Sequence, residues 1–337
     1  MNVYPFSAIV GQVELKRALI MTAVDRTIGG VLALGDRGAG KSTLIRALAA
    51  LLPKIDIIDG CQFRCAPEPM QAICKTCKAR DDARVISEIA PVIDLPLGAS
   101  EDRIVGALDL ERALSAGERR FEPGLLAAAH RGFLYIDEVN LLEDHLVDLL
   151  IDVAASGENI VEREGMSVRH AAQFVLVGSG NPEEGELRPQ LIDRFGLAVD
   201  VRTPTDVKER VEIVKRRDAF EREPAVFLKK WRRKDAAIRK QIEEARSMID
   251  EIETPDALLE EAAGLCIALG TDGLRGELTL MRAARASAAL DGDTAVTTDH
   301  LRAVAPMALR HRLRKDPLDD SDASIRVARA IEEVLPA

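Results

Sequence analysis

The feature that most constrains the fold is a glycine-rich loop. Residues 35–42 read Gly-Asp-Arg-Gly-Ala-Gly-Lys-Ser and match the pattern G-x-x-x-x-G-K-S. A short apolar segment, residues 31–34, precedes the loop and is typical of a buried strand. Good helix formers follow the loop up to residue 52, before Pro53. A phosphate-binding loop connects a strand to a helix, and this order is present here. The alternative is a glycine turn that precedes a lysine by chance, but such a turn would not need a strand before it and a helix after it.

This loop predicts a specific chemistry. Glycines allow successive backbone N–H groups to point at phosphate oxygens, and the helix N-terminus adds a partial positive charge. We expect Lys41 to contact the β- and γ-phosphates of ATP, and the Ser42 hydroxyl to ligate Mg²⁺. The other residues predicted to bind the nucleotide here are Gly35, Asp36, Arg37, Gly38, Ala39, Gly40 and Thr43.

Two further apolar segments end in polar residues that suit nucleotide hydrolysis. Residues 132–136 run into Asp137 and Glu138, the pattern known as Walker B. Asp137 is expected to hold Mg²⁺ directly or through water, and Glu138 to polarise the attacking water. Asn181 follows the buried strand predicted at residues 174–180 and is expected to orient that water, although Asn before Pro182 is also a common turn signal.

Arg194 and Arg275 are the candidate arginines of the site. An arginine placed against the γ-phosphate can accelerate hydrolysis by about 10³–10⁵-fold, so one is expected in a site of this kind. For any single arginine, the alternative is a solvated surface charge.

The order of the elements predicts an α/β fold with a doubly wound parallel sheet, followed by a smaller all-helical domain. Strands and helices alternate up to residue 203, with a loop expected at 100–108, a helix at 109–116, a helix from Pro123, and a hairpin around residues 164–165. Helices are then expected at 206–220, 227–252, 258–269, 276–290 and 298–314, before an acidic, turn-rich segment at 316–324. The predicted domains are residues 1–203, a helical linker at 204–252 and a helical lid at 253–337.

Charge and hydropathy exclude several classes of protein. The net charge of −10 and the pI of about 5.2 argue against a dominant nucleic-acid surface, despite basic clusters at residues 229–234 and 310–315. No stretch approaches the roughly 18 apolar residues of a membrane span, and no signal peptide is recognisable. We therefore expect a cytoplasmic protein without a membrane partner.

The order of phosphate loop, Asp137-Glu138, Asn181, Arg194 and Arg275 is similar to that of the AAA+ ATPases. The resemblance implies that Arg194 is an arginine finger for a neighbouring subunit's nucleotide and that Arg275 is the sensor 2 of the helical lid. It also implies a helix-2 insert at about residues 98–126 and a pre-sensor-1 hairpin at about residues 159–174. The segment that resembles the adenine-contacting part of the family consists of Val10, Gly11 and Gln12.

Longer runs resemble the ATPase (I) subunits of bacterial magnesium chelatases, namely residues 100–109, 143–148, 156–159 and 178–185. This resemblance implies an ATP-dependent homo-oligomeric ring, usually a hexamer. In that family the ring works with an integrin-like-domain subunit and a large porphyrin-binding subunit to insert Mg²⁺ into protoporphyrin IX, which begins the chlorophyll and bacteriochlorophyll branch. The alternatives are a remodelling chaperone of the MoxR kind and the ATPase subunit of a cobalt chelatase. The acidic total disfavours a DNA-unwinding motor.

Four cysteines, Cys61, Cys65, Cys74 and Cys77, form a pattern that the resemblance does not explain. The spacing Cys74-x₂-Cys77 is that of a metal-binding turn, and four thiolates suit tetrahedral Zn²⁺. The eight-residue middle spacer is shorter than the roughly 12–20 residues of familiar zinc modules. Iron–sulfur ligation, redox-sensitive thiols and plain reduced thiols therefore stay open. Cys266 is expected in the core.

Overall fold

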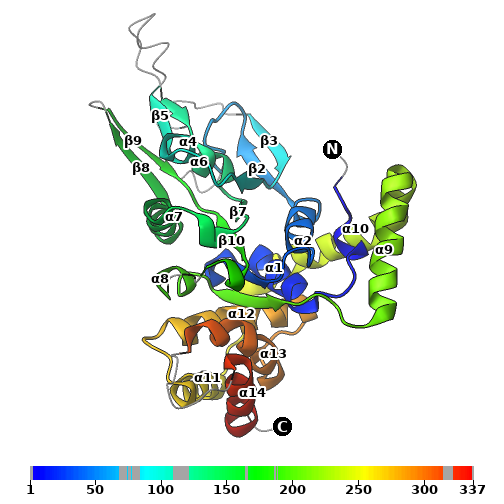
Figure 1. The fold of residues 1–337 in the computed structure, drawn as a ribbon. Helices are drawn as coiled ribbons and strands as arrows, with labels where there is room; N and C mark the ends of the chain where they lie inside the picture. Colours follow the sequence, from blue (N-terminus) through cyan, green and yellow to red (C-terminus); the bar gives the residue numbers. More distant parts are fainter. Residues whose placement is uncertain are drawn as a thin grey trace, which may run out of the picture. The chain divides into compact units, whose positions relative to one another are not determined.

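The structure is a computed structural model that describes residues 3–67, 74, 77, 84–108, 121–163, 166–185, 187, 189–313 and 322–335. The chain divides into two compact units. The first comprises Met1–Leu51 and Gly180–Ala337, and the second comprises Leu52–Ser179. Figure 1 follows the elements of both along the sequence. The domain boundaries predicted at residues 203 and 252 stay predictions.

One five-stranded sheet has the strand order β11-β1-β10-β7-β4. Its strands are β1 (Val31–Gly35), β4 (Val92–Leu95), β7 (Phe133–Ile136), β10 (Val175–Gly180) and β11 (Leu197–Val201). The pairs β1–β11, β7–β10 and β4–β7 are parallel. Continuous apolar runs form these strands, as expected where helices cover both faces of a parallel sheet. The predicted α/β fold class is confirmed.

In the first unit, α1 (Val13–Val24) precedes β1 in the sequence and α2 (Lys41–Leu48) follows it. Helix α2 is shorter than the sequence predicts. Ala49 N–H donates to the Arg46 carbonyl and Leu51 N–H to the Leu48 carbonyl, at 3.2 and 2.8 Å. These i to i−3 hydrogen bonds tighten the chain into a turn ahead of Pro53, since the residue before a proline disfavours helical geometry.

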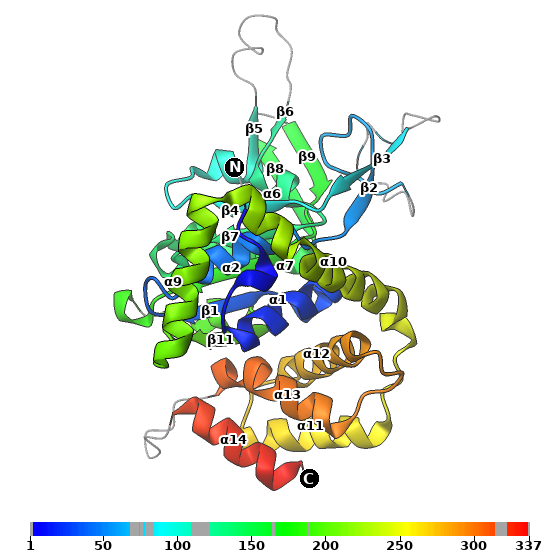
Figure 2. The same ribbon diagram turned by 90° about the vertical axis from the view of Figure 1, so that its right-hand side faces the viewer.

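Two long helices follow β11, namely α9 (Val207–Arg222) and α10 (Pro224–Met248), which Figure 2 shows joined at one end and diverging at an angle. Aromatic rings hold the two helices together. Tyr4 lies 5.0 Å from Phe220 and 5.4 Å from Phe227, and Phe227 lies 6.1 Å from Trp231, between ring centroids. The basic run at 229–234 partly covers this cluster, because Lys234 Nζ lies 4.9 Å from the Trp231 ring centroid.

Four more long helices belong to the described part of the first unit, α11 (Asp256–Leu269), α12 (Arg275–Asp291), α13 (Thr298–Leu309) and α14 (Ala323–Val334). They pack against one another, as Figures 1 and 2 show. The first three were predicted from their apolar periodicity. Helix α14 was not, because the acidic segment before it reads as a turn. Asp322 in fact caps α14, accepting a hydrogen bond of 3.1 Å from Ser324 N–H.

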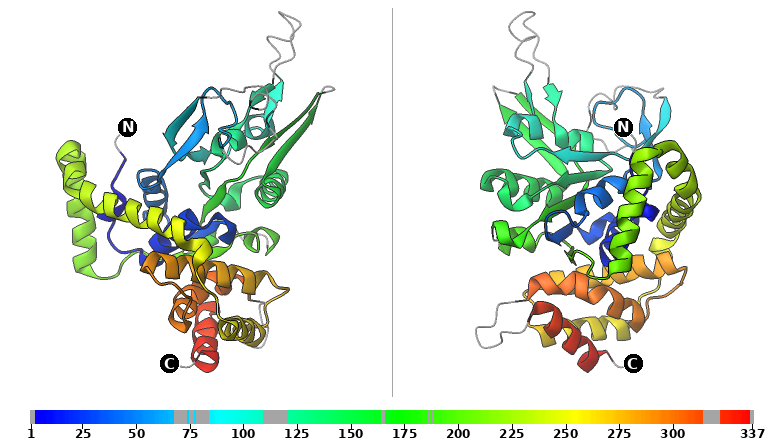
Figure 3. Two further views of the ribbon diagram at one scale, coloured as in Figure 1. Left: turned by 180° about the vertical axis from the view of Figure 1, so that it is seen from behind. Right: turned by 45° about the vertical axis from the view of Figure 1, so that its right-hand side comes forward.

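The described residues of the second unit form three two-stranded antiparallel sheets besides their share of the large sheet. They pair β2 (Lys54–Ile58) with β3 (Val85–Ile89), β5 (Gly106–Leu108) with β6 (Phe121–Pro123), and β8 (Glu158–Arg163) with β9 (Met166–Ala171). Helices α4 (Glu101–Val105), α6 (Leu125–Ala129) and α7 (Asp144–Ser156) belong to the same unit. Strands β8 and β9 are the long green hairpin in both views of Figure 3 and confirm the predicted hairpin.

One local prediction in this unit is wrong. Residues 100–108 are not a loop, because Ser100 caps α4 by accepting from Arg103 N–H at 3.4 Å and the following residues pair as β5 with β6. The helix predicted from Pro123 is confirmed as α6, although it starts at Leu125 and Pro123 itself ends β6. The helix predicted at 109–116 and the hairpin turn at 164–165 lie outside the described residues.

Among the residues that the structure describes, the shorter elements are α8 (Pro189–Ile192) and six 3-10 turns, Phe6–Ala8, Arg26–Ile28, Val139–Leu141, Pro182–Glu184, Ile249–Glu251 and Arg310–Arg312. Within the described part of the chain, no helix combines the length and the apolar character needed to cross a membrane.

Candidate nucleotide site

The phosphate loop lies between β1 and α2 in the first unit, as predicted. All three of its glycines have backbone angles that other residues rarely adopt, with φ of +144° at Gly35, +77° at Gly38 and +84° at Gly40. Gly40 directly precedes the eight-residue helix α2. Lys41 Nζ donates to the carbonyls of Gly35 and Asp36, at 2.5 and 2.8 Å. The ammonium group is thus held against the loop at a helix N-terminus, a combination suited to binding anionic phosphates.

The segment Val10-Gly11-Gln12 contacts the phosphate loop. Gln12 Nε2 donates to the Ala39 carbonyl at 2.5 Å, and both Gly11 and Gln12 have positive φ angles, of +64° and +51°. A cavity of about 420 Å³ lies beside this contact. This volume is within the roughly 300–1,000 Å³ range of small-molecule pockets. Its lining includes the predicted residues Val10, Gln12, Gly38, Ala39, Gly40 and Thr43.

The same cavity has walls that the sequence did not indicate. Thr203 and Pro204, just beyond β11, contribute to it together with Arg210 and Arg217 of α9. Arg210 Nε donates to the Pro204 carbonyl at 2.6 Å, so the start of α9 is held to the end of the strand. Their location just after a strand could have indicated these residues, because ligands of α/β proteins bind at the carboxyl ends of parallel strands.

Asp137 lies in the second unit, just after β7, and two hydroxyl groups hold its carboxylate. Tyr135 and Ser179 donate to Asp137 Oδ1, with oxygen–oxygen distances of 2.7 and 2.6 Å. Ser179 Oγ also accepts from the N–H of Glu138 at 3.3 Å, and Glu138 has a left-handed φ of +54°. Hydrogen bonds to a carboxylate are stronger than neutral ones, so the orientation of Asp137 is well defined.

Sequence reasoning missed Tyr135 and Ser179. A signal for Tyr135 exists, because residues two apart on a strand point to the same face. Ser179 could not be found in this way, because it comes from β10 and meets Asp137 only through the parallel register of β7 and β10.

Asn181 begins the 3-10 turn Pro182–Glu184 in the first unit and is 7% exposed. Its Oδ1 accepts from Glu183 N–H at 3.2 Å, and its Nδ2 donates to Glu184 Oε1 at 3.1 Å. Glu184 forms an ion pair with Arg37 of the phosphate loop. The predicted water-orienting residue is therefore linked to the loop through one carboxylate.

Both candidate arginines are associated with the turn at Asp193 in the first unit. Arg275, at the start of α12, pairs with the Asp193 carboxylate, and Arg312 pairs with its other oxygen at 2.5 Å. Arg194 is the next residue along the chain, and its side chain is exposed. Arg275 and Arg312 thus hold the turn that presents Arg194.

The four cysteines of the quartet converge in the second unit. Their sulfur atoms all lie within 4.8 Å of one another, and all four residues are buried. Cys266 lies apart from the quartet, in α11, where it is buried together with Ala262, Leu265 and Leu269, as predicted for a core residue. Burial raises the pKa of its thiol to about 11.

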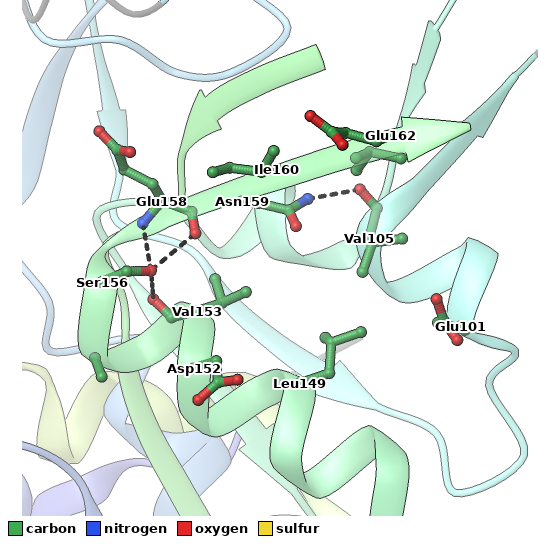
Figure 4. A pocket seen from close by; sticks show the side chains of 12 residues that line it. Glu101, Val105, Leu149, Asp152, Val153, Ser156, Glu158, Asn159, Ile160 and Glu162 are labelled. Atoms are coloured by element: carbon green, nitrogen blue, oxygen red, sulfur yellow. Dashed lines mark hydrogen bonds between the residues drawn. The ribbon is translucent and has the colours of Figure 1, made fainter. Parts of the chain in front are cut away.

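A second cavity, of about 890 Å³, lies beside the β8–β9 hairpin within the second unit (Figure 4). The residues around it come from α4, α7 and β8, and Asn159 Nδ2 donates to the Val105 carbonyl at 2.8 Å across one side. Four carboxylates contribute to the lining, those of Glu101, Asp152, Glu158 and Glu162.

Comparison with known proteins identifies the family. The chain is 64% identical to the magnesium-chelatase 38 kDa subunit of Acidiphilium rubrum, covering 98% of this chain and 97% of that protein. It is 62% identical to the corresponding subunit of Rhodobacter capsulatus, covering 99% and 95% of the two chains. The family model "Magnesium chelatase, subunit ChlI" matches residues 109–190, and that of the AAA lid domain matches residues 259–333.

The chain belongs to the magnesium-chelatase 38 kDa subunit family. The family resemblance predicted from the sequence is therefore confirmed, and with it the assignment to the AAA+ ATPases. The roles of the individual site residues stay predictions.

Solved structures agree with this assignment. A chain in a complex between subunits BchI and BchD of magnesium chelatase, based on a cryo-EM reconstruction, is 59% identical over the full length of both chains, with a TM-score of 0.54. A putative ATPase from Cytophaga hutchinsonii has a TM-score of 0.63 over 98% of this chain and 92% of its own. At 15% identity it supports the fold alone.

Proposed function

We propose that this chain hydrolyses ATP to drive the insertion of Mg²⁺ into protoporphyrin IX, together with two other chelatase subunits. The observation that carries the proposal is the 64% identity to a magnesium-chelatase subunit along almost the whole of both chains. A remodelling chaperone or a cobalt chelatase subunit would share the phosphate loop but would not require this full-length similarity.

The residues of the first unit fit a bound nucleotide. The cavity beside Gln12 and the loop provides space for the base and sugar, and the open space beside Gly38, where an added Cβ would meet no described atom within 4 Å, leaves room for phosphate oxygens. Lys41 would bind the β- and γ-phosphates. We assign the adenine-contacting role to Val10, Gly11 and Gln12, and the hydrogen bond from Gln12 to the Ala39 carbonyl supports this assignment.

The residues that would hold the metal of MgATP are Ser42 and Asp137. Bound Mg²⁺ neutralises charge that develops on the phosphate oxygens during hydrolysis. Tyr135 and Ser179 would keep the Asp137 carboxylate in one orientation, because both donate to the same oxygen atom. Glu138 would polarise the attacking water and Asn181 would orient it.

The proposed assembly is a homo-oligomeric ring, hexameric in its usual form, in which Arg194 reaches the nucleotide of a neighbouring subunit. The exposure of Arg194 supports this role, as does the anchoring of Asp193 by Arg275 and Arg312. The BchI–BchD complex supports a second chelatase subunit as partner. A large porphyrin-binding subunit completes the proposed enzyme.

A reconstituted chelatase assay tests the proposal. The purified chain is mixed with the two partner subunits of a related magnesium chelatase, protoporphyrin IX, Mg²⁺ and ATP, and the absorbance of Mg-porphyrin is followed. We expect product only with ATP, and none with Lys41→Ala. Hydrolysis of ATP without Mg-porphyrin, in a mixture where the authentic subunit works, would instead indicate a remodelling chaperone.

The assembly is tested with Arg194→Ala. This variant should bind ATP and form rings, but its hydrolysis should fall by about 10³-fold or more, as for other arginine fingers. Arg233→Ala removes another exposed arginine, in α10, and is the matched control. Normal hydrolysis in homogeneous Arg194→Ala rings would place the finger elsewhere.

A further inference from the structure

The cysteine quartet forms a compact set of sulfur atoms. Cys61 and Cys74 have their sulfur atoms 4.0 Å apart, and the four sulfur atoms all lie within 4.8 Å of one another. A tetrahedral ion with Zn–S bonds of about 2.3 Å holds its sulfur ligands about 3.8 Å apart. A mononuclear tetrahedral site therefore fits these positions with little movement.

The backbone around Cys61 and Cys65 is shaped as a tight knuckle at the end of β2. Cys61 N–H donates to the Ile58 carbonyl at 3.1 Å, and Ile58 N–H donates to the Cys65 carbonyl at 3.1 Å. Arg64, between the two cysteines, has a left-handed φ of +52°. A left-handed conformation is unfavourable for a residue other than glycine. The turn that brings the sulfur atoms of Cys61 and Cys65 together therefore contains a residue in an unfavourable backbone conformation.

We propose that Cys61, Cys65, Cys74 and Cys77 bind one structural Zn²⁺ ion in the second unit. The proposal rests on the convergence of the four sulfur atoms. Packing in a hydrophobic core would explain why the thiols are buried, but it would not explain why all four sulfur atoms are directed at one point. Clusters with several iron atoms hold their cysteine sulfur atoms around a larger centre than one ion requires, which favours Zn²⁺.

The site is connected to the pre-sensor hairpin by ring stacking. Phe63, inside the knuckle, stacks on His170 of β9 with 4.6 Å between ring centroids and 17° between ring planes. His170 Nδ1 lies 3.0 Å from the Ala171 carbonyl and so carries the proton, which leaves Nε2 to accept from Asn159 Nδ2 at 3.0 Å. Asn159 also donates to the Val105 carbonyl. Zinc would thus fix the knuckle against β8 and β9.

Metal analysis of the full chain, purified anaerobically without added metal chelators, tests the proposal. We expect about one zinc per chain in the natural protein and almost none in a Cys74→Ser/Cys77→Ser double variant. Cys266→Ala is the matched control, because it removes a buried thiol outside the quartet and should keep the full zinc content. Less than about a tenth of a zinc per chain in the natural protein, or iron in its place, would overturn the proposal.

A second measurement does not depend on the folding of the double variant. Zinc is removed from the natural chain with a chelator, and hydrogen exchange is compared before and after. Amides of the β8–β9 hairpin should exchange faster after removal and recover when Zn²⁺ is added back, while those of α11–α13 should not change. Replacing zinc by Co²⁺ should give the visible absorption of a tetrahedral cobalt thiolate. Thiols that bind no Co²⁺ and a hairpin insensitive to the chelator would both contradict the site.

Discussion

Gly35→Ala should destabilise the protein more than a substitution at any freely placed glycine of the same loop. Gly35 ends β1 with a φ of +144°, and an added Cβ would lie 2.0 Å from the Val201 carbonyl oxygen. Gly35 and Val201 are partners in the parallel register of β1 and β11. The carbonyl therefore cannot retreat without breaking the pairing of the two strands.

The magnitude follows from two terms. A side chain forced into a glycine-only backbone region costs about 1–3 kcal/mol. Overpacking against an atom that cannot move costs about 1–3 kcal/mol more. The expected loss is therefore about 2–6 kcal/mol. Gly38→Ala is the matched control, because its φ is +77° but an added Cβ meets no described atom within 4 Å. It should cost only the left-handed strain of about 1–2 kcal/mol.

Urea unfolding of the natural chain and both variants, followed by circular dichroism, measures the difference. The unfolding midpoint should fall clearly further for Gly35→Ala than for Gly38→Ala, with similar slopes. Equal midpoints would refute the reasoning, since the two variants would then differ in neither packing nor pairing.

Two further predictions concern single side chains. Tyr135→Phe removes a hydroxyl that donates to Asp137 Oδ1 at 2.7 Å. Because hydrogen bonds to charged groups contribute about 1.5–3 kcal/mol, the Mg²⁺ concentration for half-maximal ATP hydrolysis should rise about tenfold or more, and an unchanged Mg²⁺ dependence would contradict this. Burial, with help from neighbouring Arg312, lowers the pKa of His311 from its ordinary 6.5 to about 3. The unfolded chain then binds more protons between these values, so the stability contributed by neutral His311 is present above pH 6.5 and is lost as pH falls towards 3. Unfolding midpoints from pH 7 to pH 4 should therefore fall less in His311→Gln, and parallel losses in both proteins would count against the shift.

Sequence patterns were enough to predict those elements whose function depends on residues that are neighbours along the chain. The phosphate loop was predictable because strand, glycines and helix are contiguous, and their local conformations follow from residue type. The same holds for Asp137 after β7 and for the hairpin of β8 and β9. The long amphipathic helices after residue 206 were predictable because their apolar spacing repeats over many turns.

Contacts between residues far apart in the sequence became known only from the three-dimensional structure. Residues 106–108 form a strand only because residues 121–123 pair with them, which no local pattern announces. Ser179 reaches Asp137 through strand register, and Asp193 joins Arg275 to Arg312 through the packing of helices far along the chain. The cysteine spacing left several chemistries open. The convergence of four sulfur atoms within 4.8 Å favours a single metal ion, because distances between side chains depend on how the backbone folds back on itself.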